Sequence, residues 1–242
     1  MLSVIIPSYD FHDLTVVHAR EAMNADTTPD EVIVVNDGGT PDLLDKLKEL
    51  PKKCRLVYAR IERDIPWNYP GACNLGAWLS RGDLLFFEDN DNIPTRTFYT
   101  QALQYLEDNP DIGRITARGR SVISLDDVLA KPVEEWKEIN SIGPNQGTSC
   151  VRRDVFLKIK GQDERFAGEY GWHYYNLKRQ LLTRAKVKFG SVGMYYYTHE
   201  GQSKLSRSMS KRNQSLLRLN SRVGAVQAPS GILNFQYAYE VL

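Results

Sequence analysis

The stretch LLFFEDND, residues 84–91, places four apolar residues directly before a cluster of acidic and amide side chains. A short apolar run of this kind is typical of a buried strand, and the polar cluster marks the point where that strand ends. Asp89 and Asp91 are separated by one residue, so both carboxylates can approach one cation at a bending strand end. Carboxylate oxygens are ligands that Mg²⁺ and Mn²⁺ prefer. We therefore predict a core strand that carries a metal site at its carboxyl end, although such a pair by itself also occurs in solvated turns.

Similar apolar runs precede this stretch and alternate with amphipathic segments, which predicts βαβ units and a mostly parallel sheet. The predicted strands are residues 4–6, 31–35, 55–59 and 83–87, and the predicted helices are 14–24, 41–50, 72–80 and 94–109. The second half of the chain is less regular. There we predict a strand within 114–124, a polar surface excursion at 125–146, helical segments at 150–157 and 166–184, and a strand pair at 187–197.

Polar residues follow three of the predicted parallel strands, at 7–10, 36–39 and 88–92. Asn, Asp and Gly form turns readily, so any one of these groups is explained by turn formation. In an open α/β sheet, however, ligands bind beyond the carboxyl ends of the strands. Three such groups at one sheet edge therefore indicate a binding site.

Composition limits the function. The chain has 242 residues, a formal net charge of +1 and 42% hydrophobic residues, so a disordered or fibrous protein is excluded. A net charge near zero excludes a protein that coats nucleic acid through bulk electrostatics. The three cysteines are too few for a disulfide framework, and no apolar run is long enough to span a bilayer. These features, with a start that has no signal-peptide pattern, favour a cytoplasmic protein.

Three segments carry a family resemblance. Residues 3–9 (SVIIPSY), 34–39 (VVNDGG) and 87–91 (FEDND) resemble the corresponding segments of family 2 glycosyltransferases, which have the GT-A fold. Residues 67–68 (WN) and 72–77 (ACNLGA) are similar to the segment that these enzymes place before the metal-binding strand. The resemblance implies an α/β GT-A fold, with a Rossmann-like central sheet flanked by helices and a smaller acceptor-side portion.

The later part of the chain extends this resemblance. Residues 161–166 (GQDERF) and 170–172 (YGW) resemble the acceptor-side motif of galactosyltransferase-type members. Residues 197–199 (YTH) resemble the strand that delivers a histidine to the metal. The match then covers about residues 2–202, in order.

The resemblance implies roles for the donor-site residues. Pro7 and Tyr9 would bracket the nucleobase of a nucleotide sugar, and Asp37 would accept a hydrogen bond from the base or ribose. Asn68 and Asn74 are likewise assigned to the donor site. The implied donor is a UDP-sugar.

The resemblance also implies a metal site. Asp89 would lie near the ribose and the metal, Asp91 would bind the metal directly, and His199 would complete the protein ligands. The implied cofactor is Mn²⁺, with Mg²⁺ as the alternative, and it would neutralise the diphosphate leaving group.

One departure from the family pattern concerns the general base. Related enzymes follow the Gly-Trp segment with a Glu-Asp pair whose Asp deprotonates the acceptor, whereas this chain has His173 and Tyr174 at these positions. A phenol with a pKa of about 10 is a poor base at neutral pH. Three explanations stay open. His173 is the base, a carboxylate such as Glu169 or Asp163 has taken over, or the site binds a donor without transferring its sugar.

The C-terminal part carries a charge bias. Residues 203–222 contain six cations and no acid, interleaved with apolar residues, which indicates an amphipathic helix. We therefore divide the chain into a glycosyltransferase domain at 1–202, with a nucleotide-sugar half at 1–110 and an acceptor half at 111–202, and a basic tail at 203–242. Three roles for this helix stay open. It packs on the domain, it attaches the protein peripherally to an anionic membrane, or it holds nucleic-acid phosphates.

The function predicted from the sequence is metal-dependent transfer of a sugar from a UDP-sugar to a hydroxyl, with inversion. The acceptor is a glycan, a lipid-linked sugar or a modified DNA base. One alternative is a nucleotide-sugar-binding module with an inactive acceptor side. The other is a nucleotidyltransferase. The sequence argues against this alternative, because no glycine-rich loop with a basic residue follows the first strand.

Overall fold

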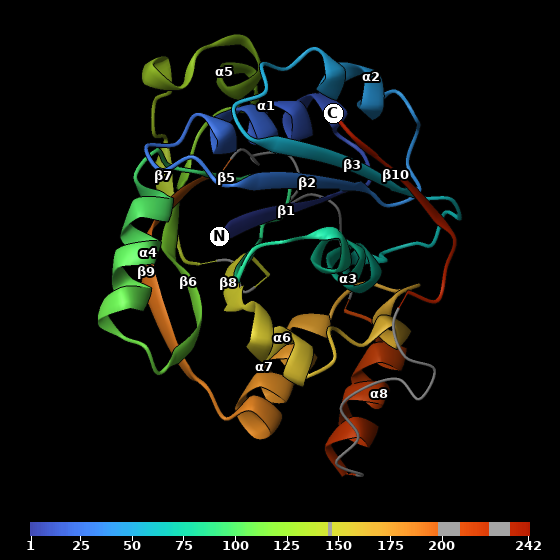
Figure 1. Cartoon of the computed structure of the whole chain (residues 1–242). Helices are drawn as coiled ribbons and strands as arrows, with labels where there is room; N and C mark the ends of the chain where they lie inside the picture. Colours follow the sequence, from blue (N-terminus) through green and yellow to red (C-terminus); the bar gives the residue numbers. More distant parts are fainter. Residues whose placement is uncertain (145–146, 198–208, 223–232) are drawn as a thin grey trace.

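A computed structural model describes residues 1–144, 147–197, 209–222 and 233–242 of the chain. The four strands predicted in the first half are present. They are β1 (Leu2–Ser8), β2 (Glu31–Asn36), β3 (Arg55–Ile61) and β4 (Leu84–Phe87). These strands pair in parallel in the order β3-β2-β1-β4, so their carboxyl ends meet at one edge of the sheet (Figure 1).

The second half of the chain extends the same sheet beyond β4. The added strands are β5 (Asn92–Pro94), β6 (Ile112–Val122), β7 (Asn140–Ile142), β8 (Ser149–Arg152), β9 (Lys188–Tyr197) and β10 (Tyr237–Val241). The full order is β10-β3-β2-β1-β4-β8-β6-β9-β5, with β7 paired to β6. β8 is antiparallel to both β4 and β6, so the sheet is mixed although its first part is parallel.

Helices cover both faces of the sheet (Figure 1). α1 (His12–Met23), α2 (Leu43–Lys48) and α5 (Leu125–Ala130) lie on one side, and α4 (Phe98–Asp108) lies beside β6 and β9. α3 (Tyr69–Leu79), α6 (Arg153–Lys158), α7 (His173–Gln180) and α8 (Lys211–Arg222) lie on the other side. Short helical turns occur at Val133–Glu135, Glu164–Phe166 and Leu181–Ala185. Among the described residues, every helix is too short or too polar to cross a bilayer.

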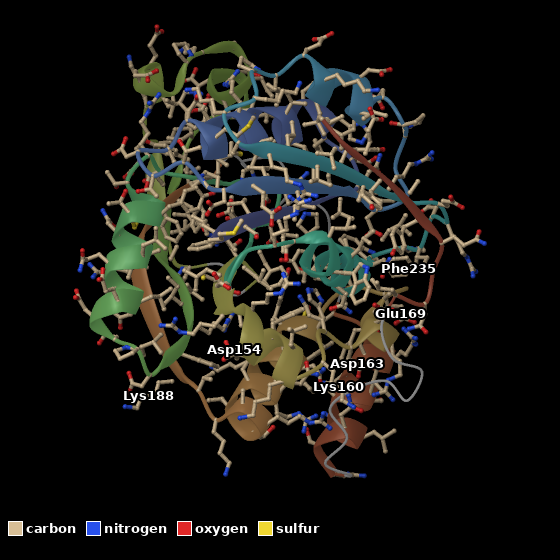
Figure 2. The ribbon with its side chains drawn as sticks, in the orientation of Figure 1. Asp154, Lys160, Asp163, Glu169, Lys188 and Phe235 are labelled. Carbon is tan, nitrogen blue, oxygen red and sulfur yellow. The ribbon has the colours of Figure 1, made fainter. Side chains whose placement is uncertain are left out.

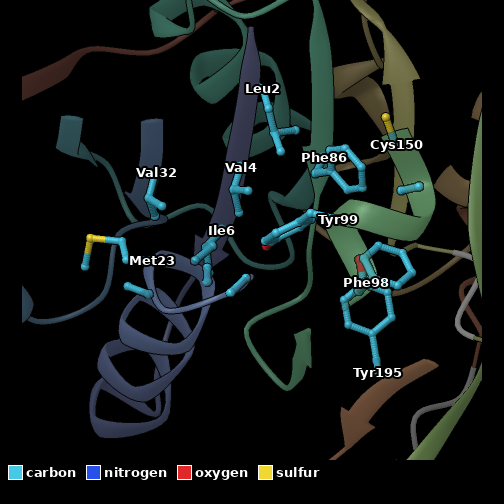
Figure 3. Close-up of a cluster of buried hydrophobic side chains, with 14 of the residues drawn as sticks. Leu2, Val4, Ile6, Met23, Val32, Phe86, Phe98, Tyr99, Cys150 and Tyr195 are labelled. Atoms are coloured by element: carbon cyan, nitrogen blue, oxygen red, sulfur yellow. The ribbon is translucent and has the colours of Figure 1, made fainter. Parts of the chain in front are cut away.

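The side chains of β1 point alternately to the two faces of the sheet and so contribute to a hydrophobic core on each face. Leu2, Val4 and Ile6 face α1 and α4, where they join a buried cluster that includes Phe86 (Figure 3). Ile5 faces the opposite side and packs with residues of α3, α6 and α7. Because successive side chains of a strand point to opposite faces, an apolar run without alternation predicts this two-sided burial.

Three elements differ from the sequence prediction. The helix expected from residue 94 begins at Phe98, because Pro94 lies in β5, at the edge of the sheet, where a missing N–H is tolerated. The helix expected at 150–157 is a strand, β8, followed by α6. The strand pair expected at 187–197 is one continuous strand, β9. Gly190 lies within this strand, where a Cβ atom would lie 2.4 Å from the Tyr105 ring, so the glycine allows that ring to approach the strand.

Two regions contain elements that the sequence prediction left out. The excursion at 125–146 includes α5 and β7. The predicted tail contains a helix, α8, within the segment where one was expected, and also a strand, β10. β10 pairs antiparallel with β3 along Tyr237–Val241. The end of the predicted tail is therefore part of the central sheet.

Candidate active site

A cavity of about 610 Å³ lies at the carboxyl ends of β1, β2 and β4. Its lining comprises Pro7, Ser8, Tyr9, Asp10, Phe11, Asp37, Pro66, Trp67, Tyr69, Asp89, Asn90, Asp91, Arg120, Tyr170, Gly171, His173 and Tyr174. Residues from all three predicted strand ends are present. The segment 170–174, here called the acceptor-side wall, contributes Tyr170, Gly171, His173 and Tyr174. The cavity therefore brings together segments that are distant in the sequence.

The acidic cluster forms a tight turn between β4 and β5. The backbone N–H of Asn92 donates to the carbonyl of Asp89 at 2.9 Å, and the Asn92 amide donates to the Asp91 carboxylate at 3.0 Å. The Asn90 amide reaches across to the carbonyl of Asp10 at 3.2 Å, which joins this turn to the loop after β1. The predicted strand end thus holds Asp89 and Asp91 in one wall of the cavity.

A buried polar network lies directly beneath this turn. The Glu88 carboxylate, fully buried, pairs with His18 at 2.8 Å and accepts hydrogen bonds from the hydroxyls of Tyr99 and Tyr195 at 3.1 and 3.0 Å. His18 also contacts the carbonyl of Asn90 at 3.3 Å. Because buried charges require such partners, the network fixes the base of the acidic turn. Sequence reasoning missed it, although Glu88 within an otherwise apolar strand end was a visible signal.

Three of the residues predicted for the donor site, Pro7, Tyr9 and Asp37, line the cavity. Asn68 lies behind Asp37 and donates to its carboxylate at 3.0 Å. Burial raises the pKa of Asp37 well above its usual value, and the hydrogen bond from Asn68 opposes that rise. Asn68 therefore contributes to this wall by positioning Asp37.

Asn74 does not lie in the cavity lining. Its amide donates to the carbonyl of Gln162 at 2.9 Å and to Glu164 at 2.8 Å, and its oxygen accepts from the Gln162 N–H. These contacts tie α3 to the segment before the acceptor-side wall. In this structure Asn74 joins two segments of the protein and does not face the predicted donor site.

His173 lines the cavity as predicted for a base, but its imidazole is largely buried. Burial lowers its pKa to about 3, and a hydrogen bond with the backbone of Gly171 only partly offsets this effect. The ring packs against Tyr69 and Tyr174, with centroid distances of 5.2 and 3.8 Å, and its Nε2 is buried without a hydrogen-bond partner among the described residues. The imidazole is therefore neutral at physiological pH.

Tyr174, for which the sequence resemblance implied the position of a catalytic Asp, lines the cavity. Burial is the largest cause that raises its pKa well above the usual value, and the charges of Asp89 and Asp91 add to the rise. A Cβ atom at residue 147 would lie 2.5 Å from the Tyr174 ring, so Gly147 provides the space that the ring needs. Tyr174 is consequently a neutral hydrogen-bonding group.

Glu169 and Asp163, the other predicted bases, are not in the cavity lining. Figure 2 shows both on the side of the molecule where α8 lies. Glu169 accepts a hydrogen bond from the Ser210 hydroxyl. Asp163 is 2% exposed and forms a two-pronged ion pair with Arg165, at 2.9 and 2.7 Å. Because these contacts hold the acceptor-side segment together, both carboxylates serve packing in this structure.

Aromatic side chains form the outer rim of the cavity. Trp67 is 48% exposed and meets the Tyr170 ring edge-on at 4.9 Å. The backbone of Trp67 is left-handed, with φ of 53°, a conformation that costs free energy for a bulky residue and often occurs at binding sites. Trp172, the indole singled out by its place in the sequence motif, does not line the cavity and packs on Tyr175.

The donor atoms present suit a hard divalent cation. Asp89 and Asp91 supply carboxylate oxygens from one turn, as Mg²⁺ and Mn²⁺ require. No cluster of three His, Cys, Asp or Glu side chains with ligand geometry occurs in the part of the chain that the structure describes. His199, the third predicted ligand, lies outside the described residues. The two carboxylates therefore fit a cation that keeps further positions for phosphate oxygens or water.

Comparison with known proteins supports the resemblance. The model of the family described as glycosyl transferase family 2 matches residues 3–157. An uncharacterized glycosyltransferase from Rickettsia bellii is 32% identical over 108 residues, which are 45% of this chain and 15% of that protein.

Two solved structures have similar folds. One is the mannosyltransferase PcManGT from Pyrobaculum calidifontis in complex with GDP-Man and Mn²⁺, with a TM-score of 0.61, 14% identity, and coverage of 91% of this chain and 61% of that one. The other is S. aureus TarS 1–349 in complex with UDP-GlcNAc, with a TM-score of 0.61, 16% identity, and coverage of 90% and 65%. This chain thus spans under two thirds of either solved chain. The similarity confirms the predicted GT-A fold, and because the family model covers more than half of the sequence, this chain belongs to glycosyl transferase family 2.

Proposed function

We propose that this protein transfers a sugar from a nucleotide diphosphate donor, a UDP-sugar, to an acceptor hydroxyl with inversion. The observation that carries this proposal is the cavity in which the ends of β1, β2 and β4 meet, with Asp89 and Asp91 in one wall. A TarS structure contains UDP-GlcNAc and the PcManGT structure contains GDP-Man with Mn²⁺, and both share this fold. Family membership and these folds support the proposal.

The donor nucleotide is assigned to the side of the cavity formed by β1 and β2. The rings of Pro7 and Tyr9 offer apolar faces to a nucleobase, and Tyr9 is held by a hydrogen bond to Asp64 at 3.2 Å. Asp37, positioned by Asn68, can exchange a hydrogen bond with the base or the ribose. These contacts orient the nucleotide so that its diphosphate extends toward the acidic turn.

Asp89 and Asp91 would hold the divalent cation beside that diphosphate. A bound Mn²⁺ or Mg²⁺ would neutralise negative charge on the leaving group. Burial is the largest cause that raises the pKa of the Tyr69 phenol well above its usual value, and the charge of Asp89 and a hydrogen bond with it add to the rise. The phenol therefore stays protonated and donates a hydrogen bond toward Asp89.

His173 is the group we propose as the base, because it is the one member of the three predicted bases that lines the cavity. Its low pKa makes it a weak proton acceptor in the empty site. Negative charge near an imidazole raises its pKa, so a bound donor diphosphate would favour proton uptake. The ring must also expose Nε2, which Tyr69 and Tyr174 now cover.

The acceptor is assigned to the rim formed by Trp67 and Tyr170. Aromatic faces provide extended apolar contact for a sugar or a base, while Tyr phenols add a polar edge. The two rings come from loops joined by a 2.6 Å hydrogen bond from the Gly168 N–H to the Pro66 carbonyl. A glycan, a lipid-linked sugar and a modified DNA base all present a ring to such a rim.

The test is the release of nucleotide from UDP-, GDP- and TDP-sugars, with Mn²⁺ or with a chelator, in the wild type and in Asp91→Asn. We expect metal-dependent hydrolysis of a UDP-sugar that Asp91→Asn abolishes. The matched control is Asp10→Asn, a cavity aspartate to which no metal role is assigned. The proposal would be contradicted if no donor binds, and also if donors bind but none is hydrolysed.

A second candidate function is a nucleotide-sugar-binding module, and the observation that favours it is the neutral Tyr174 at the position of the family base. This candidate predicts UDP binding with Mn²⁺ but no turnover of any donor. Tyr174→Asp would then restore hydrolysis if the lost carboxylate is the reason for inactivity. Turnover by the wild type would exclude this candidate.

A further inference from the structure

The positive charge of this protein is concentrated on one side. Residues 152–222 contain sixteen lysines and arginines against five acids, whereas the rest of the chain has fifteen against twenty-five. The basic segment supplies α6, α7 and α8, which lie together on the side of the sheet away from α1, α2 and α5 (Figure 1). The net charge of +1 is therefore the sum of a positive segment, residues 152–222, and a negative remainder of the chain.

α7 and the helical turn that follows it expose a mixed stripe. Tyr175, Lys178 and Leu182 follow one another at spacings of three and four residues, so they lie on one face of the helix. Tyr175 is 54% exposed and Leu182 is 48% exposed, although both are large and apolar. The opposite face, with Leu177 and Leu181, packs in the core.

α8, which contacts α7 through Asn220 and Asn176, also exposes a cationic stripe. Lys211, Arg218 and Arg222 lie on one exposed face, with Leu219 exposed next to them. Its inward face is polar, since Asn213 and Asn220 are the buried residues of the helix. Asn213 donates to the carbonyls of Phe166, Glu169 and Gly171, at 2.9, 2.8 and 3.2 Å. The helix is thus anchored by these amides and by Arg212, which donates to the carbonyls of Ala167 and Arg165 at 3.0 and 3.1 Å. Lys211, Arg218 and Arg222 remain exposed.

Two of the acids on this side are engaged within the protein. Asp163 pairs with Arg165, and Glu169 accepts a hydrogen bond from Ser210. Arg179 has a pKa lowered first by burial and then by the nearby positive charge of Arg184. Two guanidinium groups within electrostatic reach of each other indicate a positive potential that an anionic partner would relieve.

We propose that the face formed by α7, the turn 181–185 and α8, here called the basic face, binds the surface of an anionic lipid bilayer. Lysine and arginine interact with the lipid headgroups, and Tyr175, Leu182 and Leu219 enter the interfacial region. Exposed aliphatic side chains between the cations favour a bilayer over nucleic acid, which would leave them in water. This inference does not depend on the proposed catalytic activity.

The basic face adjoins the cavity. α7 begins at His173, a residue of the cavity lining, and the N–H of Ser210 donates to the carbonyl of Tyr170 at 3.0 Å just before α8 starts. Both helices therefore start at the wall formed by residues 170–174. A bilayer under this face would place the acceptor-side wall next to the lipid headgroups.

The test is co-sedimentation of the full chain with vesicles of phosphatidylcholine alone or mixed with phosphatidylglycerol, at low and high salt. We expect binding to the anionic vesicles only, with high salt weakening it. Lys211→Glu/Arg218→Glu/Arg222→Glu should lower the partition coefficient by about a hundredfold or more, since each of the three cations near an anionic surface contributes about fivefold. Leu182→Ser/Leu219→Ser should weaken binding even at low salt.

The matched control is Lys53→Glu/Arg118→Glu/Lys137→Glu, which makes the same charge change on exposed residues outside the basic segment. This variant should bind vesicles as the wild type does. Equal loss in both triple variants would overturn the proposal, because bulk charge would then explain the binding. Absence of binding to anionic vesicles, or binding to duplex DNA that the two serine substitutions leave unchanged, would also overturn it.

Discussion

The two walls of the cavity are built by different means. The donor-side wall consists of strand ends, so the hydrogen-bonded register of β1, β2 and β4 sets where Pro7, Asp37 and Asp89 lie. The acceptor-side wall at 170–174 is a loop and a helix start, held by side chains from α8 such as Asn213. The sheet therefore fixes the donor-side wall, whereas polar contacts from a helix distant in the sequence fix the acceptor-side wall.

The largest expected effect concerns the network under the donor-side turn. Glu88→Leu should lower the free energy of unfolding by about 3–5 kcal/mol, because it leaves buried His18 without the carboxylate that it contacts and two tyrosine hydroxyls without an acceptor. Urea unfolding measures this change, and Glu107→Leu on the exposed face of α4 is the control. A loss of no more than about 1 kcal/mol would show that the network does not support this wall.

Asp91→Asn tests the donor-side wall by ligand binding. We expect the affinity for UDP in Mn²⁺ to fall about a hundredfold, because the variant removes a charged oxygen ligand while the fold stays intact. Isothermal titration calorimetry with Mn²⁺ and with chelator measures it, and Asp10→Asn is the control for cavity charge. Unchanged affinity in Asp91→Asn would remove the metal site from this turn.

The buried imidazole of His173, on the acceptor-side wall, should make the stability of the protein depend on pH. Its pKa is about 3 in the folded protein and about 6.5 when unfolded, so the unfolded chain binds the proton more tightly. Stability therefore falls as the pH drops below about 6.5, and this residue should contribute a loss of about 2 kcal/mol between pH 7 and pH 5. Urea unfolding of the wild type and of His173→Phe at both values measures it. An equally steep loss in the variant would contradict the buried neutral imidazole.

Asn213→Ala gives the smallest expected effect and separates the walls most clearly. It should cost about 1–2 kcal/mol of stability, because it removes the amide donor shared by three backbone carbonyls of the acceptor-side segment. The affinity for UDP in Mn²⁺ should stay within about twofold, since the donor-side wall is held by the sheet. Ser215→Ala, exposed on the same helix, is the control. A parallel loss of UDP affinity would show that the two walls are coupled.

Much of the donor-side wall could be predicted from the sequence. Apolar runs such as 84–87 identify buried strands, and polar residues directly after them must lie at the sheet edge where parallel strands end. Pro7, Tyr9, Asp37 and Asp91 were identified in this way and line the cavity. Their proposed roles in binding and catalysis stay predictions.

The acceptor-side wall was less accessible to sequence reasoning. Trp67 lines the cavity from a residue with left-handed backbone, a conformation that no pattern in the sequence indicates. Asn213 has no hydrophobic or charge pattern, so its contacts with a segment more than forty residues away leave no signal in one sequence. β10 was missed for the same reason, since a strand that adds to a sheet edge depends on a partner, β3, far along the chain.

The central claim is that Asp89 and Asp91 hold a divalent cation against the diphosphate of a nucleotide in this cavity. The most direct measurement is a crystal structure of the protein soaked with UDP and MnCl₂, with an anomalous difference map at the manganese edge. We expect one anomalous peak in contact with the Asp91 carboxylate and the UDP diphosphate, with the uracil against Tyr9. A manganese peak away from Asp89 and Asp91, or UDP bound outside the cavity, would contradict the account.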